Sequence, residues 1–193
     1  MEQKAIIETH GVITIRPIKP AELKDVIKLL KKSFKIHNVF SGPTKDIRKY
    51  LAKLRKAEEN NPLTFGIIVA TLQEEKKDVL AGTMVVRTSA MSKEGLHASF
   101  KYMHLAVNEK YRKHGIGTKL MGYADEKIHQ LIEKGKIKTA RVQVNIAEPE
   151  KETINFYEKS GFHVEANLSN YYRYNEQVYI LSKLISAEEN KEG

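Results

Sequence analysis

The junction of a strand, a glycine turn and a helix constrains this chain most. The run His97–Val107 is predicted to be a strand with an apolar end, and a short basic loop separates it from an amphipathic helix predicted over Gly115–Lys134. Glycines at 115 and 117 let the backbone turn tightly and approach a ligand closely. The first N–H groups of a helix lack internal partners and carry about half a positive charge. The junction therefore predicts a binding site for a phosphate or pyrophosphate.

Two other phosphate loops are excluded by their spacing. A dinucleotide fingerprint needs a glycine three residues after Gly117, where Leu120 stands. A Walker loop needs a lysine after Gly122, where Tyr123 stands. The pattern that fits is Arg112-x-x-Gly115-x-Gly117.

This pattern resembles the Arg/Gln-x-x-Gly-x-Gly/Ala motif of the GCN5-related N-acetyltransferase (GNAT) family. The segment Ile154–Phe162 resembles a second family block, in which a tyrosine is followed four residues later by Gly-Phe. A third segment, from Asn170 to Ile180, resembles the Asn-Tyr-Tyr and closing strand of the ribosomal-protein and protein N-terminal acetyltransferases in the family. An alternative for this third segment is a hairpin whose aromatic side chains pair across strands. The resemblance covers roughly residues 97–185.

The resemblance implies an N-acetyltransferase that moves an acetyl group directly from acetyl-CoA to a primary amine. It implies that acetyl-CoA lies between strands 97–107 and 139–146, and that the peptide groove is lined by Tyr171 and Tyr172. Phe40 is selected as a further acceptor contact because its loop is apolar, not from the resemblance. The loop carrying Ile36, Val39 and Phe40 is expected to expose apolar groups to the acceptor, or to pack on the core or on a partner subunit. The residues expected to bind acetyl-CoA are Leu105, Ala106, Val107, Arg112, Lys113, His114, Gly115, Ile116, Gly117, Thr118, Asn145 and Tyr157.

Tyr157 matches the family's tyrosine near the cofactor sulfur. A phenol with a pKa near 10 can act as general acid toward a leaving thiolate. Standing alone, Tyr157 would be interpreted as a packing residue on an amphipathic helix.

The general base is the part of the site in which the chain departs from the family. Two positions that often carry a base are occupied by Lys101 and Arg141. A histidine near pKa 6.5 would suit the task, and we select His104 as the second catalytic residue. The other candidates are His97, Glu165 and Glu176.

The predicted fold class is α/β, a GNAT-like mixed and twisted sheet of about seven strands with helices on both faces. One acetyltransferase domain is expected over residues 12–186, after a polar lead-in at 1–11 and before a frayed tail at 187–193. The expected strands are 12–16, 63–72, 79–88, 97–107, 139–146, 162–168 and 177–184, and the expected helices begin at Pro20 and Thr44 and cover 115–134 and 149–160.

The amino-acid composition excludes several kinds of cofactor and partner. With no cysteine among its 193 residues, the chain can form no disulfide, thiolate metal site or cysteine nucleophile, and its seven histidines show no ligand spacing. No apolar run reaches the roughly 20 residues that cross a bilayer. We therefore expect a cytoplasmic protein with no metal and no membrane partner. A homodimer is compatible with the sequence.

Three functions stay open at this stage, two acetyltransferases that differ in their acceptor and one binding module. The first is a protein N-terminus or lysine, and the second is a small amine such as an amino acid, amino sugar or polyamine. The third is a non-catalytic module that binds CoA or nucleic acid through the net charge of +9, although we do not expect nucleic acid as the partner.

Overall fold

The structure is a computed structural model that describes residues 3–7, 11–34, 40–60, 63, 65–74 and 77–187. Ile36 and Val39, which the sequence placed in an apolar loop, lie outside the described residues, as does most of the expected tail.

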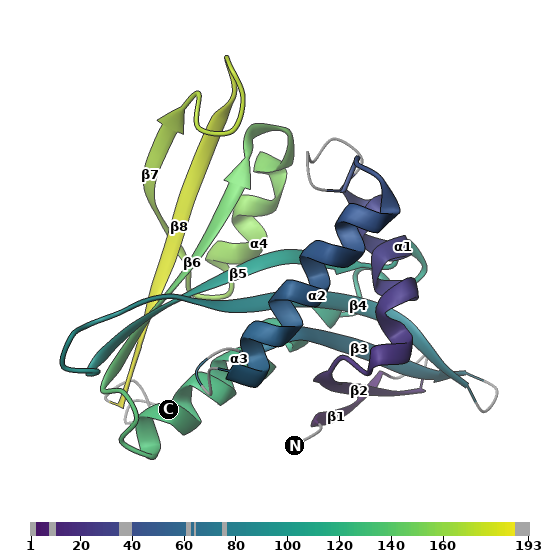
Figure 1. The fold of residues 1–193 in the computed structure, drawn as a ribbon, viewed down its shortest axis with the longest axis horizontal. Coiled ribbons are helices and arrows are strands. Elements are labelled where there is room, and N and C mark those ends of the chain that lie inside the picture. The colour runs from purple at the N-terminus through teal and green to yellow at the C-terminus, as the bar shows by residue number, and fades with distance from the viewer. Residues whose placement is uncertain are drawn as a thin grey trace. The chain divides into compact units, whose positions relative to one another are not determined.

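The order of elements confirms the predicted α/β class, with one strand more than expected (Figure 1). β1 (Gln3–Ile7) lies within the segment expected to be a polar lead-in, so that expectation was wrong for these five residues. It pairs antiparallel with β2, with Gln3 opposite Ile15 and Ile7 opposite Gly11. The remaining elements are β2 (Gly11–Pro17), α1 (Leu23–Ser33), α2 (Thr44–Asn60), β3 (Gly66–Glu74), β4 (Lys77–Met91), β5 (His97–Val107), α3 (Ile116–Glu133), β6 (Thr139–Ala147), α4 (Ile154–Glu158), β7 (His163–Ser169) and β8 (Gln177–Ser186).

The strands form a mixed sheet in the order β1-β2-β3-β4-β5-β6-β8-β7. β5 and β6 pair in parallel, whereas β2 with β3, β3 with β4, β6 with β8 and β7 with β8 are antiparallel. The chain divides into two compact units, one made of residues 1–87 and 104–124 and the other of residues 88–103 and 125–193. The single domain expected over 12–186 stays a prediction.

The first unit is built around strands that are buried on both faces. All seven residues from Gly66 to Leu72 in β3 are buried, which requires cover on each side of the sheet. Helix α2 packs against β3. It buries Ile47, Leu51 and Leu54, whose spacing of three and four residues places them on one helix face.

The second unit is organised around β6. Its first five residues pair with His97–Lys101 of β5, and the whole strand pairs with β8 from Thr139 opposite Ser186 to Ala147 opposite Val178. The helix expected over 149–160 is instead a 3₁₀ segment (Glu148–Thr153) followed by the short α4. Thr153 donates its hydroxyl to the Glu150 carbonyl at 2.8 Å, and this local bond favours the tighter 3₁₀ turn.

β4 runs three residues further than predicted, to Met91. The connection to β5 is consequently short. Ser92 closes it, because its hydroxyl accepts the amides of Leu96 and His97 at 3.1 Å each. The connection is therefore shorter than the gap between the strands expected over 79–88 and 97–107.

Candidate functional site

The junction between β5 and α3 has the backbone geometry that the glycine motif predicted. After β5 ends, the Asn108 amide donates to the Ala81 carbonyl at 2.8 Å and its side chain accepts from the Lys110 amide at 3.3 Å. A 3₁₀ turn (Glu109–Tyr111) follows. Lys113 and Gly115 then adopt the left-handed conformation, with φ of 66° and 70°. Glycine tolerates this conformation readily, whereas a side chain strains it.

Helix α3 begins with amides that precede its first helical bond. That bond runs from the Lys119 amide to the Gly115 carbonyl at 2.9 Å. The amides of Ile116, Gly117 and Thr118 therefore come ahead of it, as is usual for the first turn of a helix. A Cβ added at Gly115 would meet no atom within 4 Å, so the space beside this turn is open. Open space beside helical amides suits an anionic ligand.

The predicted donor-binding residues of this region lie in two neighbouring segments, 105–107 and 112–118. Leu105, Ala106 and Val107 end β5, and Arg112 to Thr118 form the turn and the first residues of α3. Arg112 is exposed, and its Nε donates to the Val107 carbonyl at 3.3 Å. The motif arginine therefore helps to close the turn that carries it.

A brace to β3 holds the turn, and the sequence did not reveal it. Tyr111 is buried, and its hydroxyl donates to Glu74 Oε1 at 2.8 Å. The Lys110 Nζ also donates to Glu74 Oε1 at 2.8 Å. Burial, and next the bond to Glu74, raise the pKa of Tyr111, so this hydroxyl stays protonated and remains a donor.

Gly82 lets α3 begin close to the sheet. A Cβ at this β4 position would lie 3.0 Å from Ile116 Cγ2, 3.1 Å from the Ala106 carbonyl oxygen and 3.2 Å from Leu120 Cδ1. Only glycine leaves room for this approach. A glycine inside a strand pattern can signal close packing of this kind, and this signal could have identified Gly82.

His104 lies in an aromatic cluster of the first unit. Its Nε2 is 2.8 Å from the Tyr50 hydroxyl, and its ring is edge-on to Phe40 at 4.7 Å and to Phe34 at 6.2 Å. The His104 backbone has φ of 54°, which interrupts the extended strand and re-aims the side chain. Tyr50, on α2, was not predicted as part of the site.

Phe40 does not present the open surface expected of an acceptor contact. Its side chain is 1% exposed and packs against Phe34, Tyr50 and His104. Of the alternatives given for its loop, packing on the core holds for Phe40, because the aromatic cluster covers it. Its role as an acceptor contact stays a prediction.

Tyr157 lies on α4 and packs on two phenylalanines. The ring centroids of Phe156 and Phe162 lie 5.1 Å and 5.7 Å from that of Tyr157, both edge-on. Burial, and next the charge of Glu150, raise the pKa of Tyr157 far above its usual value of 10.0. The phenol therefore keeps its proton at neutral pH, as a proton donor must.

Asn145 and the tyrosines of the β7–β8 loop meet in the second unit. Asn145 Nδ2 donates to the Tyr172 hydroxyl at 3.1 Å, and Asn145 Oδ1 accepts from Gln143 at 2.7 Å. Tyr171 and Tyr172 pack edge-on at 4.8 Å and are about half exposed, at 49% and 50%. Since both tyrosines lie in the loop between β7 and β8, they do not pair across the two strands.

The alternative bases are engaged with other groups. Glu165 forms an ion pair with Arg141 and accepts the Ser182 hydroxyl, and Glu176 accepts from Arg173 at 3.1 Å. His97 Nδ1 lies 2.7 Å from the Thr139 hydroxyl. Arg141, at a position where the family often carries a base, thus holds a carboxylate beside it.

The described residues contain neither a cluster of metal ligands nor a helix that could span a membrane. Across residues 11–34, 40–60 and 77–187 and the shorter described segments, no three His, Asp or Glu side chains gather as metal ligands. No described helix is long and apolar enough to cross a membrane.

The mixed sheet and the glycine turn at the start of α3 together define an α/β protein whose helix start suits an anionic ligand. The family model described as Acetyltransferase (GNAT) domain matches residues 65–164, just over half of the chain. The chain belongs to the GNAT family of acetyltransferases. No curated protein matches its sequence.

Solved structures share the fold at low sequence identity. Arabidopsis thaliana NAA60 in complex with acetyl-CoA is 17% identical with a TM-score of 0.66, covering 90% of this chain and 99% of that one. Arabidopsis thaliana Naa50 in complex with the bisubstrate analogue CoA-Ac-MVNAL is 19% identical with a TM-score of 0.61, covering 89% and 97%. The ribosomal-protein-S18-alanine N-acetyltransferase from Escherichia coli is 18% identical with a TM-score of 0.59, covering 90% and 94%.

Proposed function

We propose that this chain is an N-acetyltransferase that uses acetyl-CoA and acetylates a primary amine. The observation that carries the proposal is the left-handed turn at Gly115, with open space beside it and helical amides directly after it. The family membership supports acetyl transfer, and the NAA60 structure contains acetyl-CoA. When bound, acetyl-CoA supplies an acetyl group activated as a thioester.

The first unit supplies the pyrophosphate- and pantetheine-binding part of the proposed donor site. The amides of Ile116, Gly117 and Thr118 would hold the pyrophosphate, because helix-start amides and the helix dipole favour anions. The backbone of Leu105–Val107 would hold the pantetheine arm in the manner of an added strand. The Val107 carbonyl already accepts from Arg112, so we expect the donor to use the amides of this segment more than that carbonyl.

Tyr157 is the proposed proton donor to the leaving sulfur. Its raised pKa keeps the hydroxyl protonated, and the same shift makes complete proton loss costly. We therefore expect Tyr157 to stabilise the departing thiolate mainly through a hydrogen bond, with proton transfer late in the step.

His104 is the proposed base or the residue that orients a water acting as base. Its Nε2 shares a hydrogen bond with the Tyr50 hydroxyl, which fixes the ring. A free amine with a pKa near 10.4 is neutral only about once in 2,500 molecules at pH 7, so deprotonation of the acceptor must be assisted.

The acceptor is proposed to be a protein N-terminus or lysine. Tyr171 and Tyr172 are half exposed and Asn145 orients Tyr172, an arrangement that suits an extended peptide. The Naa50 neighbour contains a bisubstrate analogue that ends in the peptide MVNAL, which supports a peptide acceptor here.

Donor binding and acetyl transfer are tested separately. Calorimetry should detect acetyl-CoA and CoA but not single-stranded DNA, and donor at 100 times its Kd should stabilise the fold by about 2.7 kcal/mol. Thiol release should then be measured across peptides, polyamines and amino acids. The proposal fails if neither acetyl-CoA nor CoA binds at millimolar concentration.

Within this test Tyr157→Phe has a defined expectation. It keeps the ring and removes only the hydroxyl, so turnover should fall by about 10- to 100-fold while the Kd for acetyl-CoA changes little. Turnover equal to that of the unaltered protein would remove Tyr157 from the mechanism.

A further inference from the structure

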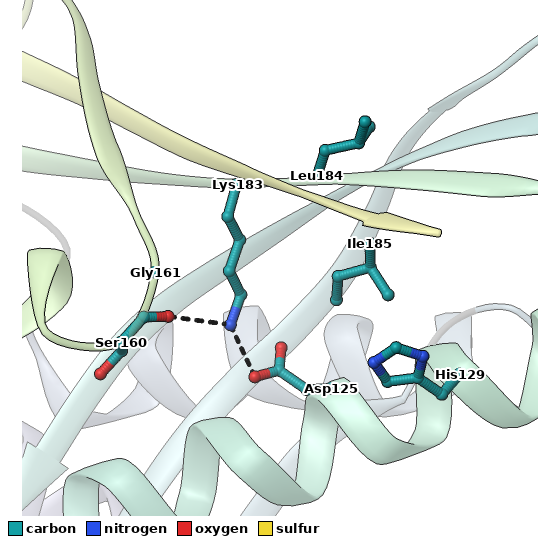
Figure 2. A pocket seen from close by; sticks show the side chains of 7 residues that line it. All are labelled: Asp125, His129, Ser160, Gly161, Lys183, Leu184 and Ile185. Atoms are coloured by element: carbon teal, nitrogen blue, oxygen red, sulfur yellow. Dashed lines mark hydrogen bonds and ion pairs between the residues drawn. The ribbon is translucent and has the colours of Figure 1, made fainter. Parts of the chain in front are cut away.

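Lys183 of β8 makes three contacts at once within the second unit. Its Nζ donates to Asp125 Oδ2 at 2.6 Å and to the Ser160 carbonyl at 3.2 Å, as Figure 2 shows. The same Nζ lies 4.8 Å from the centroid of the Phe162 ring. The side chains of Lys183 and Asp125 are only 12% and 22% exposed, where they border a pocket of about 220 Å³. The ammonium group thus ties α3 to the turn that follows α4.

Asp125 is itself fixed by a second partner. Its Oδ1 accepts the Tyr102 hydroxyl at 2.7 Å. Tyr102 is 4% exposed, and its ring packs edge-on to Phe162 at 6.2 Å. With one carboxylate oxygen held by Tyr102 and the other by Lys183, Asp125 has little freedom to turn.

The turn at residues 160–162, which Lys183 contacts, is also hydrogen-bonded to Tyr157. The amides of Ser160 and Phe162 donate to the Tyr157 carbonyl at 2.8 Å and 3.2 Å. Gly161 between them has φ of 84°, a conformation that favours glycine. The Phe162 ring lies against the Tyr157 ring at 5.7 Å. Backbone bonds and ring packing therefore both lead from the ammonium group to Tyr157.

An ion pair with little exposure is a poor source of net stability, because apolar residues of similar size often replace such a pair without loss. Its directional bonds can still fix the position of the groups around it. We propose that Lys183, oriented by Asp125 and Tyr102, is a positioning residue for the Tyr157 hydroxyl. The inference rests on the proposed role of Tyr157 in acetyl transfer.

The kinetic test compares Lys183→Met with Lys136→Met, an exposed lysine in the same unit. Lys183→Met should lower kcat by about tenfold, since small misplacements of catalytic groups cost up to about 100-fold, and leave KM for acetyl-CoA within about twofold. In the Tyr157→Phe background the same substitution should lower kcat no further. Losses that multiply in the double variant would show that Lys183 acts elsewhere and would overturn the proposal.

A second readout needs no activity. In protein labelled with 3-fluorotyrosine, the Tyr157 signal is the ¹⁹F resonance that disappears in Tyr157→Phe. This resonance should shift or broaden in Lys183→Met and stay in place in Lys136→Met. Asp125→Asn keeps the shape of the side chain but removes its charge and so weakens its bond to Lys183 Nζ. It should therefore shift or broaden the Tyr157 resonance in the same way. This variant replaces Lys183→Met in the test if Lys183→Met does not fold.

The two failures can be told apart. An unmoved Tyr157 signal in a folded variant overturns the positioning role even where acetyl transfer is observed. A moved signal in a protein that neither binds acetyl-CoA nor releases thiol supports the coupling and refutes the proposed function instead.

Discussion

Gly82→Ala tests how closely α3 must approach the sheet. The added Cβ would lie 3.0–3.2 Å from Ile116 Cγ2, Leu120 Cδ1 and the Ala106 carbonyl oxygen. Both side chains are buried and the third contact is strand backbone, so all three neighbours must give by a few tenths of an ångström within a packed core. Overpacking a core costs about 1–3 kcal/mol. Replacing glycine by alanine also lowers the conformational entropy of the unfolded chain, which favours the folded state by about 0.4–1 kcal/mol and offsets part of that cost. We expect the free energy of unfolding to fall by about 1–2 kcal/mol.

The matched control is Gly122→Ala, the same substitution on the exposed side of α3. A Cβ at Gly122 meets no atom within 4 Å, so the higher helix propensity of alanine should raise the free energy of unfolding by about 0.5–1 kcal/mol. Each kcal/mol should move the Tm by about 2–4 °C in thermal unfolding followed by circular dichroism. Donor binding should weaken in Gly82→Ala alone, since Ala106 and Ile116 belong to the proposed donor site. If Gly82→Ala is as stable as the unaltered protein, the close approach of α3 is not what requires a glycine there.

Three further predictions concern the turn and the buried tyrosines. Gly115→Ala should strain the left-handed turn by about 1–2 kcal/mol and raise the Kd for acetyl-CoA in calorimetry; an unchanged Kd would exclude this turn from the donor site. Tyr111→Phe should lower the free energy of unfolding measured in urea by about 1–2 kcal/mol. This loss lies at the lower end for a hydrogen bond to a charged group, because Lys110 still donates to Glu74. An unchanged free energy of unfolding would mean that the brace contributes nothing to stability. Because burial and the contact with Asp125 raise the pKa of Tyr102 well above 10.0, the unfolded state releases this proton first, so stability should fall as pH rises beyond 10.0. That fall should be shallower in Tyr102→Phe, and an equal slope in both proteins would contradict the assignment.

Local patterns were sufficient for most of the fold. The alternation in His97–Val107 and the helical period after Gly115 depend on neighbouring residues, and both elements were predicted to within a residue or two. β1 was missed because it has only five residues and is defined by its pairing with β2. The helix after β6 was predicted too long because the bond from Thr153 to Glu150 favours a 3₁₀ turn.

The candidate site likewise contains a part that local sequence patterns predict and a part that they do not. The stretch from Arg112 to Thr118 is continuous in sequence, so its motif could be recognised directly. Glu74 acts on a tyrosine 37 residues away and Tyr50 on a histidine 54 residues away, and no local pattern reveals such contacts. The apolar loop of Phe40 left open whether its side chain contacts the acceptor or packs on the core, and only the structure shows that neighbouring rings bury it.

The brace at Glu74 has a consequence for how strongly this chain would hold its donor. Residue 74 stands at the far end of a strand, yet through Tyr111 it anchors the loop from which acetyl-CoA would have to depart. Under the proposed function, exchange of this one carboxylate during evolution could retune the residence time of the donor without altering any group that faces it. Turnover could then be adjusted by mutation at a site remote from the chemistry.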